Sequence, residues 1–182
     1  MRADRVRPSS AGIQRRLVAA AMLAALWIAS GAAQSGIDPA LLKRLFPMAA
    51  SFSLKGGDPP HIKALTADGK TIVGFAFWTT ELEPLERGYD GPIKILVGID
   101  MKGVLAGIVV AEHHEPYGNF SIDPPAFPAQ FRGKDVRDPF KLGQDVDAVS
   151  RATITMSSAV RAIRLSARRV ARELIAPPPA KQ

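Results

Sequence analysis

The feature that most constrains the fold is a long amphipathic segment near the end of the chain. Apolar side chains recur there at spacings of three and four residues, namely at Val160, Ile163, Ala167, Val170 and Leu174. This period places them on one face of an α-helix, and that face must be buried against another layer. The pattern predicts a helix over residues 155–174, and the prolines of the following "APPPAKQ" end it.

Two earlier segments have the pattern of β-hairpins. In the first, residues 61–80, an Asp68-Gly69 turn signal separates two β-like runs, and Phe75 and Phe77 alternate with small residues. The second covers residues 93–113, with a four-residue connection in its middle. The predicted fold class is therefore α+β, with an antiparallel sheet of two hairpins packed against a long C-terminal helix.

The remaining segments are expected to be a short helix and two loops. Residues 38–46, "DPALLKRLF", predict the helix, because Asp38 can cap it and Pro39 suits its first turn. Residues 81–92 are rich in turn formers, which predicts a polar loop. Residues 114–140 contain five prolines and little periodicity, so a loop with one short helix is expected there.

The first 33 residues have the layout of a secretory signal peptide. Five arginines precede an apolar run at residues 17–29, and the small-residue stretch "SGAAQ" follows it. The run is shorter than the roughly 20 residues that span a bilayer, which favours cleavage after Ala32 or Ala33 over an uncleaved membrane anchor. We therefore expect a signal peptide at 1–33, a domain at 34–176 and a disordered tail at 177–182, in a periplasmic or otherwise exported protein.

Charge and composition exclude several classes of function. Removing residues 1–33 takes away five arginines and one aspartate and lowers the net charge from +7 to +3, which argues against a nucleic-acid partner. The chain has no cysteine, so it forms no disulfide and offers no thiolate to zinc or an iron–sulfur cluster. His113 and His114 are adjacent, and side chains at such positions on a strand point to opposite faces, so no metal site is expected.

A cluster of hydroxyl groups precedes the predicted C-terminal helix. Ser150, Thr153, Thr155 and Ser157 fall within eight positions. Helix capping needs one or two of them, which leaves a surplus. Phosphate binding at the helix N-terminus is a second interpretation, but residues 144–158 contain no glycine and therefore no glycine-rich phosphate loop. A covalent bond from a hydroxyl would hold a phosphate without such a loop.

The segment "DAVSRAT", Asp147 to Thr153, resembles the flavinylation motif of the FMN-binding domain family. The family motif runs from an aspartate through two residues to Ser or Thr, Gly, Ala and a final Thr or Ser. Arg151 stands here where glycine is usual. The family includes the exported flavin domain of NosR-type regulators and the G subunit of the Rnf electron-transport complex.

Two further segments carry the same resemblance. "EHHEPYGNF", residues 112–120, is similar to the family's His-x-Glu-Thr-Pro-Gly segment, with Tyr117 inserted before the glycine. "FPAQFRGKDV", residues 127–136, resembles its next element. Together with the second hairpin, the resemblance covers roughly residues 60–175.

The resemblance implies an FMN cofactor and a maturation partner. It implies a phosphoester between FMN and the hydroxyl of Thr153, made by a flavin transferase that uses FAD as donor. Asp147 would then position a metal or the transferase, or stabilise the turn, whereas Thr155 and Ser157 would cap the helix or bind phosphate oxygens. The expected cofactor-binding residues are Thr153, Ala152, Ser150, Thr155, Asp147, Arg151, His113, Glu115, Tyr117 and Gly118.

The expected function is electron transfer by an exported flavoprotein to or from a membrane or periplasmic redox protein. Whether the domain also converts a substrate of its own is left open. The alternative is a cofactor-free exported module that binds a partner or assists assembly of a respiratory enzyme. The arginines of the final helix, Arg161, Arg164, Arg168 and Arg172, predict a solvated face, with docking to an acidic partner or an anionic membrane as the alternative.

Overall fold

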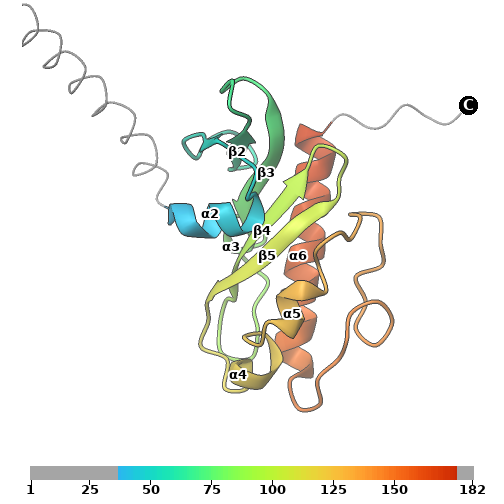
Figure 1. The fold of residues 1–182 in the computed structure, drawn as a ribbon. Coiled ribbons are helices and arrows are strands. Elements are labelled where there is room, and N and C mark those ends of the chain that lie inside the picture. Colours follow the sequence, from blue (N-terminus) through green and yellow to red (C-terminus); the bar gives the residue numbers. More distant parts are fainter. Residues whose placement is uncertain (1–36, 176–182) are drawn as a thin grey trace, which may run out of the picture.

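An antiparallel sheet of five strands lies at the centre of the structure, a computed structural model that describes residues 37–175 (Figure 1). Its strands follow one another in chain order and are β1 (Ser51–Phe52), β2 (Ile62–Leu65), β3 (Ile72–Trp78), β4 (Lys94–Asp100) and β5 (Leu105–Glu112). Strands β2 and β3 form the first predicted hairpin, and β4 and β5 form the second. The α+β fold class is confirmed, with β1 as an additional short edge strand.

The turns of both hairpins are stabilised by aspartate side chains. A carboxylate oxygen of Asp68 accepts from the backbone N–H groups of Lys70 and Thr71 at 2.9 and 3.1 Å. Asp100 likewise accepts from the N–H groups of Lys102 and Val104 at 2.8 and 2.9 Å. These bonds satisfy the turn donors locally, which is why the sequence predicts both turns well.

Two helices cover opposite faces of the sheet. Helix α6 (Thr153–Leu174) packs on one face, where its buried Ala159 and Ile163 share a core with Ile95 and other sheet residues. Helix α2 (Pro39–Leu45) packs on the other face, against a second core that includes Leu96 and Val109. Neighbouring residues of a strand point to opposite faces, so the central strands are buried on both sides.

The short N-terminal helix agrees with the prediction. Asp38 is its N-cap, and the Asp38 carboxylate accepts from the N–H of Ala40 at 2.8 Å. Pro39 occupies the first helical position, as expected.

The structure also contains three helices of four residues each, namely α3 (Thr79–Leu82), α4 (Gly118–Ser121) and α5 (Ala126–Ala129). Helix α3 takes up the last two residues of the first predicted hairpin and the first two of the loop predicted at 81–92, whereas α4 and α5 lie in the loop predicted at 114–140. The expectation of one short helix in residues 114–140 was therefore too low, because α4 and α5 both lie there. Helices this short have no amphipathic period to detect. Figure 1 shows α4 beside the first turns of α6, at the end of the molecule where the hydroxyl cluster lies.

The arginine face of α6 is only partly solvated. Arg168 donates to the carbonyl oxygens of Val136 and Asp138 at 2.9 and 2.8 Å. Arg161 lies 3.6 Å from the carboxylate of Glu86. The predicted solvated face is thus wrong for Arg168, because the segment after α5 runs along the helix and uses this guanidinium as a donor.

The predicted signal peptide at 1–33 and tail at 177–182 lie outside the described residues. Within residues 37–175, no helix has both the length and the apolar character required to cross a bilayer.

Candidate functional site

The start of helix α6 has unused hydrogen-bond donors. The helix begins at Thr153, two residues earlier than predicted, and its N-cap is Ala152, whose side chain cannot cap. The first backbone bond of the helix runs from the N–H of Met156 to the oxygen of Ala152 at 2.9 Å. In the described part of the chain, the N–H groups of Thr153, Ile154 and Thr155 find no acceptor. Such a terminus attracts an anion.

The clustered hydroxyls occupy different environments. Thr153 is exposed, and no hydrogen bond of its hydroxyl is found within residues 37–175. Thr155 is buried and donates to the carboxylate of Glu115, so the expectation that it caps the helix was wrong. Ser150 is exposed, and Ser157 is half-buried. Thr153 is therefore the most exposed of the clustered hydroxyl residues that lie on the helix.

Arg151 adopts a left-handed backbone conformation just before the helix. Its φ of 70° is one that side chains other than glycine rarely adopt. The turn itself requires this conformation, because it brings the chain from Ser150 into the first turn of α6. This explains why a glycine suits the position and shows that arginine adopts the same turn at a cost in stability.

Replacing Arg151 with glycine is expected to stabilise the folded chain. The change removes the steric penalty of the left-handed conformation and adds some chain entropy to the unfolded state, so we expect a net gain of about 0.5–1 kcal/mol. The measurement is the free energy of unfolding in urea. The control is Ser150→Gly, which adds only unfolded-state entropy and should lower stability. A loss of stability in Arg151→Gly would contradict the backbone assignment.

Glu115 joins three separate segments at this end of the molecule. It is only 6% exposed, and its carboxylate accepts from the backbone N–H groups of Tyr89 and Asp90 at 3.0 and 2.9 Å and from the hydroxyl of Thr155. Burial by itself raises the pKa of Glu115, but these hydrogen bonds and the nearby His113 outweigh it and lower that pKa below its usual value. The carboxylate is thus held ionised as an internal connector.

His113 ties the same loop to helix α4. Its Nδ1 accepts from the backbone N–H of Glu115 at 3.0 Å, which places the proton of the neutral ring on Nε2, where Asp123 lies at 2.7 Å. Gly118 packs against this ring, and a Cβ added to it would lie 2.1 Å from Cε1 of His113. A glycine is needed here because the imidazole fills the space of a side chain.

The other predicted site residues are placed less closely together. Tyr117 is 46% exposed and packs on Phe120 with ring centroids 5.4 Å apart. Asp147 is exposed, and its N–H donates to the side-chain oxygen of Gln130 at 2.7 Å. Ala152 is buried. The structure therefore links Glu115, His113, Gly118 and Thr155 by contact, whereas Thr153, Ser150, Asp147 and Tyr117 present side chains to solvent.

A basic cavity of about 240 Å³ lies farther along α6. Its lining consists of Phe140, Lys141, Leu142, Ser157, Val160, Arg161 and Arg164. Within residues 37–175, the Nε of Arg164 is a buried donor without a partner. The helical residues of this lining follow Thr153 by four, seven, eight and eleven positions, so they share its face of the helix. That spacing could have revealed the cavity, but the contribution of Lys141 depends on the fold.

Comparison with known proteins identifies the family that this part of the chain matches. Residues 88–167 match the FMN-binding domain family. This segment is an FMN-binding domain. FMN is therefore the cofactor that the domain implies, as the sequence motif predicts.

A curated relative supports the same assignment. Over 122 residues the chain is 31% identical to a protein of Erwinia tasmaniensis that is named as the G component of an ion-translocating oxidoreductase complex. The match covers 62% of this chain and 56% of that relative. The chain thus spans little more than half the length of this distant relative.

Proposed function

We propose that the domain carries FMN bound through its phosphate to the hydroxyl of Thr153 and that it transfers electrons. The observation that carries the proposal is the start of α6, where the exposed hydroxyl of Thr153 lies beside three unused N–H donors. A phosphodiester formed at Thr153 keeps one negative charge, which the positive end of the helix stabilises. Bound FMN supplies redox chemistry that amino-acid side chains lack.

We assign the flavin ring of such a cofactor to the basic cavity. It lies on the face of α6 that holds Thr153, between about 6 and 16 Å farther along the helix axis at 1.5 Å per residue. A ribityl chain can bridge the nearer part of that distance. Phe140, Leu142 and Val160 offer apolar contacts, and the unpartnered Nε of Arg164 offers a donor to the polar edge of the ring.

The three cations of the cavity would set the potential of a ring seated there. Lys141, Arg161 and Arg164 favour the negative charge that a flavin gains on reduction. Replacing Arg164 with glutamine should therefore lower the midpoint potential, by about 30 mV for each tenfold loss in relative stability of the two-electron reduced form. Potentiometry of the flavin-loaded protein measures this, with Arg172→Gln as the control. Equal potentials in the two variants would place the ring elsewhere.

The proposed setting is a membrane-associated redox chain outside the cytoplasm. The relative is named as part of an ion-translocating oxidoreductase complex, which supports a membrane redox partner for this domain. The predicted targeting segment at 1–33 would direct the domain at 34–176 across the membrane. A flavin transferase would attach the cofactor, and covalent attachment would retain it where free FMN is scarce.

Retention of flavin after denaturation tests the proposal. The full chain is produced in an exporting host with and without a flavin transferase, and the protein bands of a denaturing gel are examined for flavin fluorescence. A fluorescent band only in the presence of the transferase supports a covalent flavoprotein. Fully matured protein without fluorescence would favour the alternative, a cofactor-free module that binds or assembles a respiratory enzyme.

A further inference from the structure

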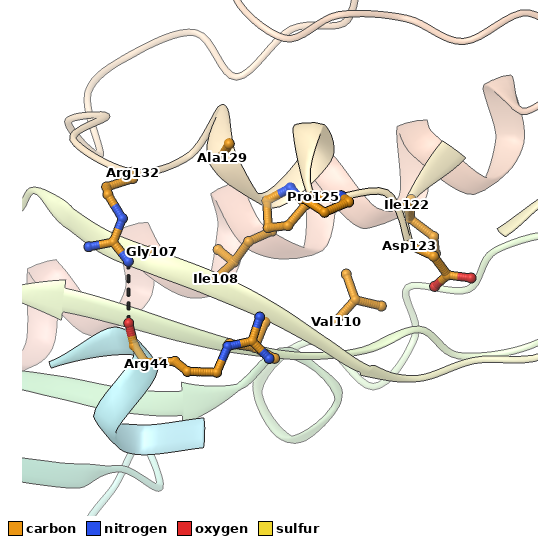
Figure 2. A pocket seen from close by; sticks show the side chains of 11 residues that line it. Arg44, Gly107, Ile108, Val110, Ile122, Asp123, Pro125, Ala129 and Arg132 are labelled. Carbon is orange, nitrogen blue, oxygen red and sulfur yellow. Dashed lines mark hydrogen bonds between the residues drawn. The ribbon is translucent and has the colours of Figure 1, made fainter. Parts of the chain in front are cut away.

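A second cavity lies along the edge strand β5, and it shares no lining residue with the basic cavity on α6. Its volume is about 350 Å³, and it lies between α2, strand β5 and the segment that contains α5 (Figure 2). Small-molecule sites of proteins are typically this size or larger. The lining mixes apolar side chains, among them Ile108, Val110 and Pro125, with the charged Arg44, Asp123 and Arg132.

Two arginines line this cavity without an acidic partner. Arg44 comes from α2 and Arg132 from the segment after α5, and the Nη2 of Arg132 donates to the backbone oxygen of Arg44 at 3.2 Å. Within the residues that the structure describes, no carboxylate lies within 4 Å of either guanidinium. Both residues line the same cavity and neither guanidinium is paired with a carboxylate of residues 37–175, which favours an anion in the cavity. Figure 2 shows the side chain of Arg44 running along the cavity, away from the guanidinium of Arg132.

The charges of the cavity are arranged along its length. Figure 2 shows Arg132 and the backbone of Arg44 at one end and Asp123 at the other, with Ile108 and Val110 between them. Asp123 is held by Nε2 of His113 at 2.7 Å. An anionic ligand group is repelled from the Asp123 end and attracted to the arginine end, so the cavity defines an orientation for a ligand that has one charged end.

Strand β5 adds polar backbone groups to the same cavity. β5 is an edge strand of the sheet. Leu105 also bonds to the backbone of residues 133 and 134, but residues 107–110 make no backbone hydrogen bond to a described segment other than β4. Alternate N–H and C=O groups of an edge strand point away from its neighbour. Gly107 has no side chain to block this edge, and a Cβ there would lie 3.3 Å from Nη2 of Arg132.

We infer that this cavity binds a small organic acid, with its carboxylate on the arginines that line the cavity, Arg44 or Arg132, and its apolar body toward Ile108 and Val110. The inference does not depend on flavin at Thr153, because the two cavities lie on different elements. The class of ligand follows from the mixed lining, since a simple inorganic anion leaves the apolar side chains unused and a neutral apolar molecule leaves both guanidiniums unpaired.

Titration of the full chain with matched probes tests the inference, with backbone amide NMR as the measurement. The probes are 4-phenylbutyrate, the neutral 4-phenylbutanol and acetate, which lacks the apolar body. We expect 4-phenylbutyrate to shift the amides of residues 107–110 to saturation and the other two probes to bind at least about tenfold more weakly, as the loss of a charge-assisted contact or of the apolar surface implies.

Variants decide whether the named arginines are responsible. Arg44→Gln and Arg132→Gln should each weaken the binding of 4-phenylbutyrate about tenfold. Arg172→Gln, which replaces an exposed arginine of α6 outside the cavity, should leave this affinity unchanged. Arg44→Gln removes an exposed charge without removing the backbone oxygen that Arg132 uses, so it remains informative even if Arg132→Gln alters the loop. Equal binding of the acid and the alcohol, amide shifts confined to residues that do not line the cavity, or unchanged affinity in Arg44→Gln would overturn the inference.

Discussion

Thr153→Ala is expected to abolish covalent attachment of FMN when the chain is produced with a flavin transferase. The substitution removes the proposed acceptor oxygen and leaves the helix intact, because Thr153 is exposed and alanine is a good helix former. Attached flavin should fall to the background of a culture without transferase. Fluorescence of the denatured band, normalised to protein, measures the loss.

Three matched variants separate the acceptor from its neighbours. Thr153→Ser keeps a hydroxyl at the same position and should retain attachment. Ser150→Ala and Thr155→Ala remove nearby hydroxyls and should retain it as well, since Thr155 is buried against Glu115 and cannot reach a modifying enzyme in the folded protein. Loss of flavin from Thr155→Ala and not from Thr153→Ala would show that Thr155 is the acceptor and that the assignment to Thr153 is wrong. Circular dichroism confirms that each variant is folded.

Gly118→Ala is expected to destabilise the protein by about 2–3 kcal/mol, within the range for overpacked sites. The new Cβ would lie 2.1 Å from Cε1 of His113 and 2.9 Å from Nδ1. The ring cannot move away freely, because both of its nitrogens are engaged, one with Asp123 and one with the N–H of Glu115. The strain therefore passes to the loop that carries Glu115. Urea unfolding measures the loss of stability.

Gly56→Ala provides the control for Gly118→Ala. A Cβ at Gly56 meets no atom within 4 Å, so this substitution should change stability by less than about 1 kcal/mol. His113→Ala combined with Gly118→Ala tests the cause, because removing the ring removes the clash. If Gly118→Ala were as stable as Gly56→Ala, the packing of His113 on Gly118 would be wrong.

The sequence predicts the fold wherever the determining interactions are local. Asp68-Gly69 predicts a hairpin turn because the aspartate binds N–H groups two and three residues away. The apolar period of α6 predicts a helix because its buried face repeats along the whole helix. Strand β1 was missed, since two residues carry no measurable alternation and depend on pairing with β2.

The sequence motif predicts which residues belong to the site, but it does not predict how the fold arranges them in space. The segment "DAVSRAT" indicates Thr153, but nothing local shows that Glu115 meets the backbone of Tyr89 and Asp90, which are 26 and 25 residues away. The capping role predicted for Thr155 was wrong for the same reason, because a tertiary contact with Glu115 replaces the local bond. Lys141 and Arg164 were not recognised as neighbours because the fold brings them together.

The most direct test of the central claim is the intact mass of the full chain matured with a flavin transferase, followed by fragmentation of the peptide that contains Thr153. The account predicts a gain of one FMN less one water, located on Thr153. An unmodified mass after maturation with an active transferase, or the same gain located on Ser150 or Thr155, would contradict it.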